Sequence, residues 1–248
     1  MKKVFHKNGI KCAQDIIEVI IGGGGWKYFK KIPESWQINY GDLKFNIKLM
    51  GFKHTGIFPE QAVNWDWMIE KIRSSKRKIK VLNLFAYTGG ATVACSYAGA
   101  EVCHVDSSKG MVTWAKENVN SSGLKDRPIR FIVDDVTKFV QREIRRGNKY
   151  DAIIMDPPSY GRGKNGEVWQ FENNLADLVE LCEKVLSDEP LFFLINSYTT
   201  GISCRVLENV LHLKINRTGK ISSGEIGLPM TASKLVLPCG IYSRWEKM

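Results

Sequence analysis

The sequence predicts an α/β fold in which a mostly parallel, seven-stranded sheet is covered by helices and preceded by a small β-rich element. From about residue 79, apolar runs alternate with amphipathic segments five times, which is the pattern of a parallel sheet with helices on both faces. The first ~75 residues instead show period-two alternation and a run of glycines. We therefore divide the 248 residues into a small N-terminal β-rich element (1–55) and a sheet domain (56–248).

The N-terminal element contains two predicted turns. Four consecutive glycines at 22–25 indicate a turn between two apolar stretches. Residues 36–40 and 43–47 alternate with period two, which predicts a hairpin turned at Gly41 and Asp42. Pro59 then begins a helix whose apolar face is expected to pack on the sheet domain.

The sheet domain supplies the seven strands. Five of them alternate with helices and are expected at 81–85, 101–105, 129–133, 150–155 and 191–195. The helices are expected at 89–98, from the cap Ser108 to Gly123, around 139–144, at 173–186 and at 206–213. The last two strands are expected at 220–226 and 235–242.

Composition bounds the class of protein. No apolar run approaches the ~18 residues that a membrane helix needs, and the N-terminus lacks the apolar core of a secretory signal, so we expect a cytoplasmic protein. The six cysteines show neither C-x-x-C pairs nor zinc-site spacing, so no metal is expected, and Cys95 and Cys103 are interpreted as small hydrophobes in apolar segments.

The net charge of +10 favours a polyanionic partner over simple solubility. Lysine and arginine cluster at 73–80 and at 142–149, although each cluster alone can also be a solvated helix end.

A glycine turn (residues 86–91) joins the first strand and helix of the sheet domain. It lacks the G-x-G-x-x-G spacing of a dinucleotide site, yet its glycines let the backbone approach a ligand. Asp106 ends the second strand, 17 residues beyond Gly89, where a carboxylate can bind ribose hydroxyls or act as a helix N-terminal charge. Asp134 and Asp135 end the third strand, where one of them can bind an adenine amino group or cap the next helix. Together they outline a nucleoside pocket without a phosphate cradle.

The fourth strand runs into Asp156, Pro157, Pro158, Ser159 and Tyr160, here called the DPPSY turn. Proline fixes φ and removes the backbone N–H, so this turn is rigid and poor in donors. In open α/β sheets ligands bind outside the carboxyl ends of the strands. The turn therefore marks a second part of the same site.

These residues resemble the class I S-adenosylmethionine-dependent methyltransferases, and most closely the branch with 23S ribosomal RNA methyltransferases acting on cytosine carbon or guanine ring nitrogen. The resemblance rests on 83–90, Asp106, Asp135 and the DPPSY turn, and spans about 56–245 with the segment 56–61. It implies a Rossmann-like methyltransferase domain, S-adenosylmethionine as cofactor, and RNA, ribosomal RNA first, as partner. The cofactor-binding residues that it implies are Phe58, Gln61, Phe85, Ala86, Tyr87, Thr88, Gly89, Asp106, Ser107 and Asp135.

The same resemblance makes Asp156, Pro157, Pro158 and Tyr160 the catalytic residues, acting by positioning an in-line displacement. Ser159 separates the prolines from the aromatic residue, unlike the turn of amino-methylating enzymes. Tyr160 is expected to stack on a base, worth ~1–3 kcal/mol, with packing into the core as the alternative.

The cytosine-carbon branch uses a cysteine directly after the fifth strand, whereas this chain has Asn196, Ser197 and Tyr198 there and only Cys204 further on. Transfer to a nitrogen, or an unassigned nucleophile, is therefore favoured over carbon-5 methylation. Residues 161–169 are expected to form a mobile flap that contacts phosphate, or an ordinary connection. A non-catalytic RNA-binding or assembly module and a small-molecule or protein methyltransferase remain alternatives. The target nucleotide and the oligomeric state stay open.

Overall fold

A computed structural model describes residues 17–19, 26–28, 31–50, 54–163, 166 and 168–248. The strands are β1 Ile17–Val19, β2 Trp26–Tyr28, β3 Trp36–Tyr40, β4 Leu43–Ile47, β5 Lys80–Leu84, β6 Glu101–Asp106, β7 Ile129–Val133, β8 Ala152–Met155, β9 Tyr160–Arg162, β10 Val168–Gln170, β11 Phe192–Ser197, β12 Lys220–Pro229 and β13 Val236–Glu246. The helices are the 3₁₀ turn η3 Pro59–Gln61, α1 Ala62–Ser74, α2 Gly90–Tyr97, α3 Lys109–Ser121, α4 Val136–Arg145, α5 Phe171–Glu183 and α6 Cys204–Lys214. The turn predicted at 22–25 lies outside the described residues.

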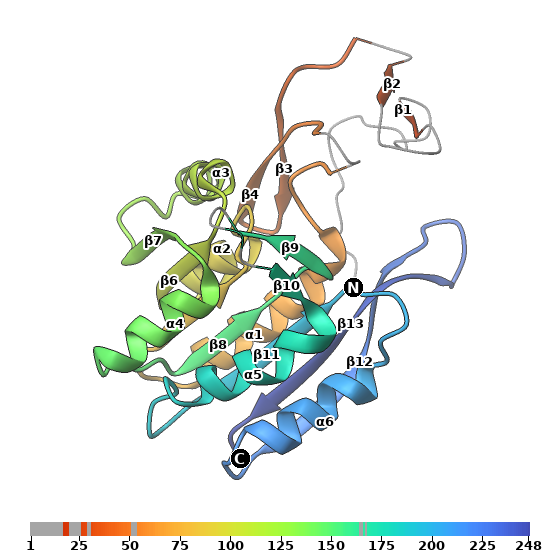
Figure 1. Ribbon diagram of the computed structural model, residues 1–248. Helices are drawn as coiled ribbons and strands as arrows, with labels where there is room; N and C mark the ends of the chain where they lie inside the picture. The colour runs from red at the N-terminus through yellow and green to blue at the C-terminus, as the bar shows by residue number, and fades with distance from the viewer. Residues whose placement is uncertain (1–16, 20–25, 29–30, 51–53, 164–165, 167) are drawn as a thin grey trace.

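The predicted seven-stranded sheet is confirmed (Figure 1). Its order is β12-β13-β11-β8-β5-β6-β7, and only β13 is antiparallel to the strands beside it, β11 and β12. The chain moves outward from β5 to β7 and then returns to β8 on the other side of β5. This reversal places a switch point between β5 and β8, where open α/β sheets bind ligands at the carboxyl ends of the strands.

Helices cover both faces of the sheet, because the parallel strands are apolar on both sides. One core lies under α4, α5 and α6 and contains Phe139, Leu175, Val179 and Leu207. The other lies under α1 and α2 and contains Trp65, Met68, Val93 and Ala94. Cys95 and Cys103 are buried, as their interpretation as small hydrophobes predicts, and Cys182 is buried as well.

The predicted hairpin of β3 and β4 is confirmed with its turn at Gly41 and Asp42. Its alternating residues Leu43, Phe45 and Ile47 are buried in the core shared with α1 and α2. Asn46 ties it further to α3, since its backbone N–H donates to Asn118 Oδ1 at 2.8 Å and its carbonyl accepts from Trp114 Nε1 at 2.8 Å. The hairpin thus packs on α3, the helix that follows β6.

Two segments differ from the prediction. The helix expected at Pro59 begins as the 3₁₀ turn η3, because proline at the first position fixes φ but only the next turn makes regular α-helical bonds. Residues 161–169 do not form a simple loop: Tyr160–Arg162 and Val168–Gln170 pair as the antiparallel strands β9 and β10, around residues that lie outside the description. No helix in the described part of the chain combines the length and the apolar surface required to cross a bilayer.

Candidate active site at the carboxyl edge of the sheet

The glycine turn leaves β5 in an unusual backbone conformation. Phe85 and Tyr87 have φ of 53° and 49°, and Gly89 has φ of 83°. Positive φ is costly for residues with a β-carbon and tends to be kept where function requires it. A β-carbon on Gly89 would also lie 2.9 Å from the Ala115 Cβ, so this close approach to α3 requires glycine.

Asp106 holds this turn in place. Its two carboxylate oxygens accept the backbone N–H groups of Tyr87 and Ser108, each at 2.8 Å. Burial raises the pKa of Asp106, and the two hydrogen bonds act against that rise. Thr88 is fixed as well, because its Oγ1 donates to the Gly56 carbonyl at 2.6 Å and its own carbonyl accepts from Asn118 at 2.8 Å. The segment 56–61 and the glycine turn therefore form one unit.

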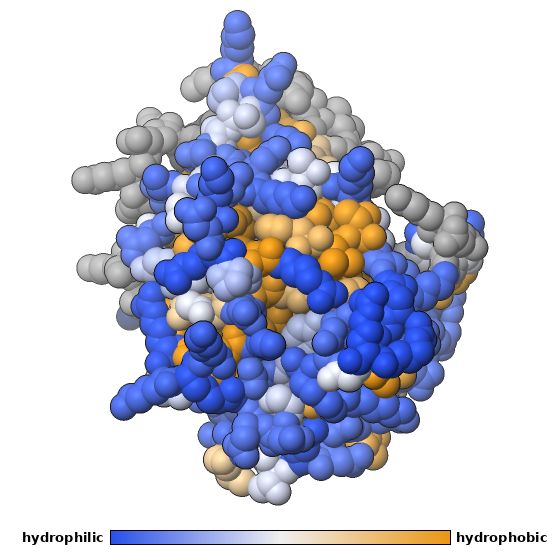
Figure 2. All heavy atoms as spheres, turned by 90° about the vertical axis from the view of Figure 1, so that its left-hand side faces the viewer, coloured by the Kyte–Doolittle hydropathy of each residue, from blue (hydrophilic) through white to orange (hydrophobic). Residues whose placement is uncertain are grey.

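Two cavities flank Phe85. The smaller, of about 60 Å³, is lined by Phe58, Gln61, Ala86, Tyr87, Thr88 and Asp156, among others. The larger, of about 240 Å³, is lined by Ser107, Val133, Asp134, Asp135, Pro158, Gly161 and Trp169. Most of the predicted cofactor and catalytic residues thus line these two cavities at one edge of the sheet, whereas Gly89, Asp106, Pro157 and Tyr160 line neither. Figure 2 shows the side that carries the edge strand β7, where apolar side chains are bounded by hydrophilic ones.

Asp134 and Asp135 have clear roles within the fold. Asp135 caps α4 by accepting the Lys138 N–H at 2.9 Å, which confirms the capping interpretation. Asp134 accepts the Asp135 N–H at 2.9 Å and forms an ion pair with Arg142. Both carboxylates still line the larger cavity, so capping and ligand binding are compatible at Asp135.

The DPPSY turn borders both cavities. Asp156 is largely buried, and burial together with the nearby Glu60 carboxylate raises its pKa to about 7. Among the described residues, none donates a hydrogen bond to this carboxylate. Pro157 is buried, and the Pro158 carbonyl accepts from Trp169 Nε1 at 2.7 Å. The turn is therefore rigid and carries a carboxylate that has no hydrogen-bond donor among the described residues.

Tyr160 is 50 % exposed at the start of β9, so the alternative in which it packs into the core is wrong. Its hydroxyl accepts from Arg162 Nε at 2.8 Å. Trp169 on β10 packs against Phe85, with ring centroids 5.1 Å apart. The β9–β10 pair thus forms a wall of the larger cavity instead of a free loop, because Trp169 anchors it.

Two residues in this region had no assigned role in the sequence analysis. Tyr198 follows β11, and its ring lies 5.2 Å from that of Phe58, which in turn lies 5.6 Å from Tyr87. Glu60 is buried next to Asp156. Its position in the segment 56–61 indicated that Glu60 lies near the predicted site. The sequence did not indicate that Glu60 approaches the DPPSY turn. Cys204 begins α6 and is half-buried, and β11 ends in Ser197 rather than cysteine.

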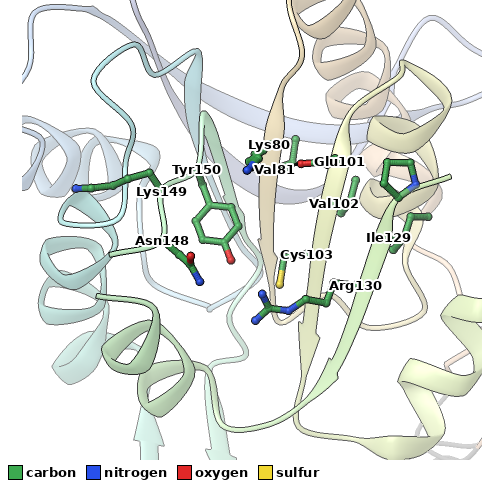
Figure 3. Close-up of a pocket in the computed structure, with 11 residues that line it drawn as sticks. Lys80, Val81, Glu101, Val102, Cys103, Ile129, Arg130, Asn148, Lys149 and Tyr150 are labelled. Atoms are coloured by element: carbon green, nitrogen blue, oxygen red, sulfur yellow. Dashed lines mark ion pairs between the residues drawn. The ribbon is translucent and has the colours of Figure 1, made fainter. Parts of the chain in front are cut away.

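A cavity larger than these two lies at the opposite, amino edge of the sheet (Figure 3). It measures about 440 Å³ and is lined by Lys80, Glu101, Cys103, Arg130, Asn148, Lys149 and Tyr150, among others. Arg130, Asn148 and Tyr150 donate to the buried Glu143 at 3.2, 2.9 and 2.6 Å. These three polar residues of the cavity lining therefore already form hydrogen bonds within the protein. The described residues contain no cluster of three or more side chains suited to a metal ion.

The carboxyl-edge cavities fit S-adenosylmethionine by their chemistry. In the larger cavity, Phe85 and Trp169 offer apolar surface to a purine, and Asp135 offers an acceptor to an amino group. Asp106 lines neither cavity, but it directly precedes Ser107, which lines the larger one, and its carboxylate keeps lone pairs beyond its two backbone hydrogen bonds. The smaller cavity, between Phe85 and Asp156, can hold the methionine part.

Comparison with known proteins agrees with this chemistry. Residues 25–209 match the family model of S-adenosylmethionine-dependent methyltransferases. A solved S-adenosylmethionine-dependent methyltransferase from Agrobacterium tumefaciens is 38 % identical and superposes with a TM-score of 0.87 over 93 % of this chain and 76 % of that one.

Relatives also include proteins named ribosomal RNA large subunit methyltransferase. The K/L protein of Shewanella frigidimarina is 35 % identical over 151 residues, which are 60 % of this chain and 20 % of that protein. The K protein of Neisseria meningitidis is 27 % identical over 169 residues, 67 % of this chain and 47 % of that protein. The chain thus matches less than half of the length of these relatives. By the family match and the Agrobacterium structure, the chain belongs to the S-adenosylmethionine-dependent methyltransferases.

Proposed function

We propose that the chain transfers a methyl group from S-adenosylmethionine to a base nitrogen of ribosomal RNA. The observation that carries this proposal is the Asp156 carboxylate, which the fold leaves without a hydrogen-bond donor among the described residues, next to the cavities that fit the cofactor. The names of the relatives and the net charge of +10 support RNA as the substrate. A ribosomal substrate agrees with the cytoplasmic location expected from the sequence.

In the cofactor part of the site, Asp106 binds the ribose hydroxyls, Asp135 the adenine amino group, and the glycine turn the methionine part. Phe58 and Gln61 close the methionine side. When bound, S-adenosylmethionine supplies an electrophilic methyl group on sulfur. The protein's contribution is to orient the acceptor and to exclude water.

On the acceptor side, Asp156 accepts a hydrogen bond from the target nitrogen and takes up its proton. A carboxyl group with a pKa near 7 is well matched to proton transfer at neutral pH. Pro157 and Pro158 keep the turn rigid, and the exposed Tyr160 ring stacks on the base. The absence of cysteine after β11 supports nitrogen over carbon-5 as the acceptor.

Methyl incorporation into ribosomal RNA tests the proposal. Purified chain and radiolabelled S-adenosylmethionine are incubated with ribosomal RNA from a strain that lacks this protein and from its parent strain. We expect label to enter only the RNA from the deletion strain, at one nucleotide identified by mass spectrometry as a nitrogen-methylated base. The absence of label in both RNAs would contradict an RNA substrate, and equal labelling of both would contradict a ribosomal nucleotide as the target of this protein. A carbon-methylated base would contradict the nitrogen acceptor.

A further inference from the structure

A buried row of polar side chains leads from the last strand to the DPPSY turn. Arg244 on β13 is 9 % exposed, and its guanidinium lies 4.5 Å from the Trp67 ring and 4.3 Å from the Tyr242 ring. Its Nε donates to Asn64 Oδ1 at 3.1 Å, and its Nη2 donates to the same oxygen. An arginine side chain offers donors only. The oxygen of the Asn64 amide must therefore face Arg244.

This contact fixes the orientation of the next two amides, whose oxygen and nitrogen ends are otherwise interchangeable. Asn64 is fully buried, and with its oxygen toward Arg244 its Nδ2 donates to Gln61 Oε1 at 2.8 Å. Gln61 is then left with its nitrogen toward Tyr198, and its Nε2 donates to the Tyr198 hydroxyl at 2.8 Å. Every bond in the row consequently points from Arg244 toward Tyr198.

The row ends at two carboxylates. Because the Tyr198 oxygen accepts from Gln61, its own hydrogen points away from Gln61, and the Glu60 and Asp156 carboxylates are charged groups that lie close to it. Glu60 is buried beside Asp156. Asn64 Nδ2 also donates to Asn196 Oδ1 at 2.9 Å, and Asn196 lines the same cavity as Asp156. The row therefore reaches the proposed acceptor site along two branches.

We propose that Arg244 is a positioning residue for the acceptor site: by fixing the direction of the hydrogen bonds through Asn64 and Gln61, it turns the Tyr198 hydroxyl hydrogen toward Glu60, beside Asp156. Its link to methyl transfer rests on the proposed function, whereas the direction of the row does not. Without Arg244 the amides can reverse, and Tyr198 then donates to Gln61 instead of Glu60.

The reversal changes how the carboxylate pair binds protons. A Tyr198 hydrogen aimed at the carboxylate pair favours the fully ionised pair, so the loss of this hydrogen makes the last proton of the pair leave at higher pH. Among the described residues, Tyr198 after β11 and Cys239 on β13 are the other titratable groups that interact with this pair. From the strength of hydrogen bonds to charged groups we expect a rise of about one pH unit.

Carboxyl-carbon NMR of the full chain labelled at aspartate and glutamate tests the proposal without any RNA. Asp156→Asn and Glu60→Gln assign the two resonances. In Arg244→Met the last proton of the pair should leave about one pH unit higher than in the parent chain, and Arg244→Lys should restore most of the difference because lysine can still donate to Asn64.

The matched control is Arg217→Met, which removes a partly buried arginine that binds Glu183 and Ser187 and should leave the titration of the pair unchanged. If Arg244→Met fails to fold, Tyr198→Phe, which removes only the hydroxyl, should give the same rise. An unchanged titration in a folded Arg244→Met or Tyr198→Phe would overturn the proposal. Failure of the parent chain to methylate RNA would instead contradict the proposed function, and the titration would still test the role of Arg244.

Discussion

Two carboxylates at opposite edges of the same sheet, Glu143 and Asp156, differ in how the fold satisfies them. Glu143 at the amino edge is fully buried and accepts hydrogen bonds from Tyr150, Asn148, Arg146 and Arg130. Burial opposes its ionisation, yet these bonds together lower the pKa of Glu143. At Asp156 on the carboxyl edge, burial and the charge of the nearby Glu60 raise the pKa to about 7.

This difference is what the proposed function uses: Glu143 is a structural carboxylate, and Asp156 is the carboxylate proposed to act on the substrate. A carboxylate whose lone pairs are filled by the protein holds elements together and has little capacity left for a ligand. A carboxylate that the fold leaves unsatisfied costs stability and gains a proton affinity suited to transfer. Cavity size alone would point the other way, since the amino-edge cavity is the larger.

The largest expected effect is on catalysis. Asp156→Asn should lower kcat for methyl transfer by about 10²–10⁴-fold, because the amide cannot take up a proton. S-adenosylhomocysteine affinity, measured by calorimetry, should stay close to that of the parent chain. Glu143→Gln is the matched control, and its folded fraction should keep the parent kcat. Equal losses in both variants would erase the distinction between the two edges.

The next effect is on stability, and here Glu143→Gln, not Asp156→Asn, should be the affected variant. Glu143→Gln should lower the free energy of unfolding by about 1–3 kcal/mol, since Tyr150 and Asn148 lose a charged acceptor. Urea unfolding followed by circular dichroism measures this change. In the same experiment at pH 7, Asp156→Asn should be as stable as the parent chain or more stable. A destabilised Asp156→Asn would mean that this carboxylate supports the fold.

Asp106 is an intermediate case, because two backbone N–H groups occupy only part of the hydrogen-bonding capacity of its carboxylate. Asp106→Ala should weaken S-adenosylhomocysteine binding by about 10- to 100-fold in calorimetry, the effect of losing hydrogen bonds to a charged group. Asp151→Ala serves as its control. Asp151 accepts from Arg77, Lys80 and Ser187 at the amino edge, so its loss should lower stability and leave the affinity unchanged.

The smallest effect is a pH dependence. Because the pKa of Asp156 is raised in the folded chain, its contribution to stability is full below its unfolded pKa and is lost as pH rises toward about 7. The stability advantage of Asp156→Asn over the parent chain should therefore grow between about pH 4 and pH 7. For Glu143, whose pKa is lowered, the stabilisation is present above its unfolded pKa and is lost in acid. A constant difference for Asp156→Asn across this range would contradict the raised pKa.

Local patterns carried most of the fold and the outline of the site. The period-two and apolar runs predicted every strand of the large sheet, and the polar residues after them located Asp106, Asp135 and Asp156. The strands β9 and β10 were missed because each is only three residues long, too short to show a period-two pattern. Their pairing depends on Trp169 packing on Phe85 and donating to Pro158.

The sequence patterns did not predict the contacts between distant segments. Glu60 approaches Asp156 only when η3 packs beside the end of β8, and the positive φ of Phe85 and Tyr87 follows from the glycine turn closing on Asp106. The direction of the hydrogen bonds from Arg244 likewise depends on β13 lying next to β11. The role of each such residue is set by its partner, and spacing along the chain does not identify that partner.

A crystal structure of the chain with S-adenosylhomocysteine tests the central claim most directly. The account predicts the ribose hydroxyls on Asp106, the adenine in the larger carboxyl-edge cavity beside Phe85, Trp169 and Asp135, and the sulfur in the smaller cavity facing Asp156. A ligand bound instead in the amino-edge cavity beside Arg130 and Tyr150, or with its sulfur turned away from Asp156, would contradict it.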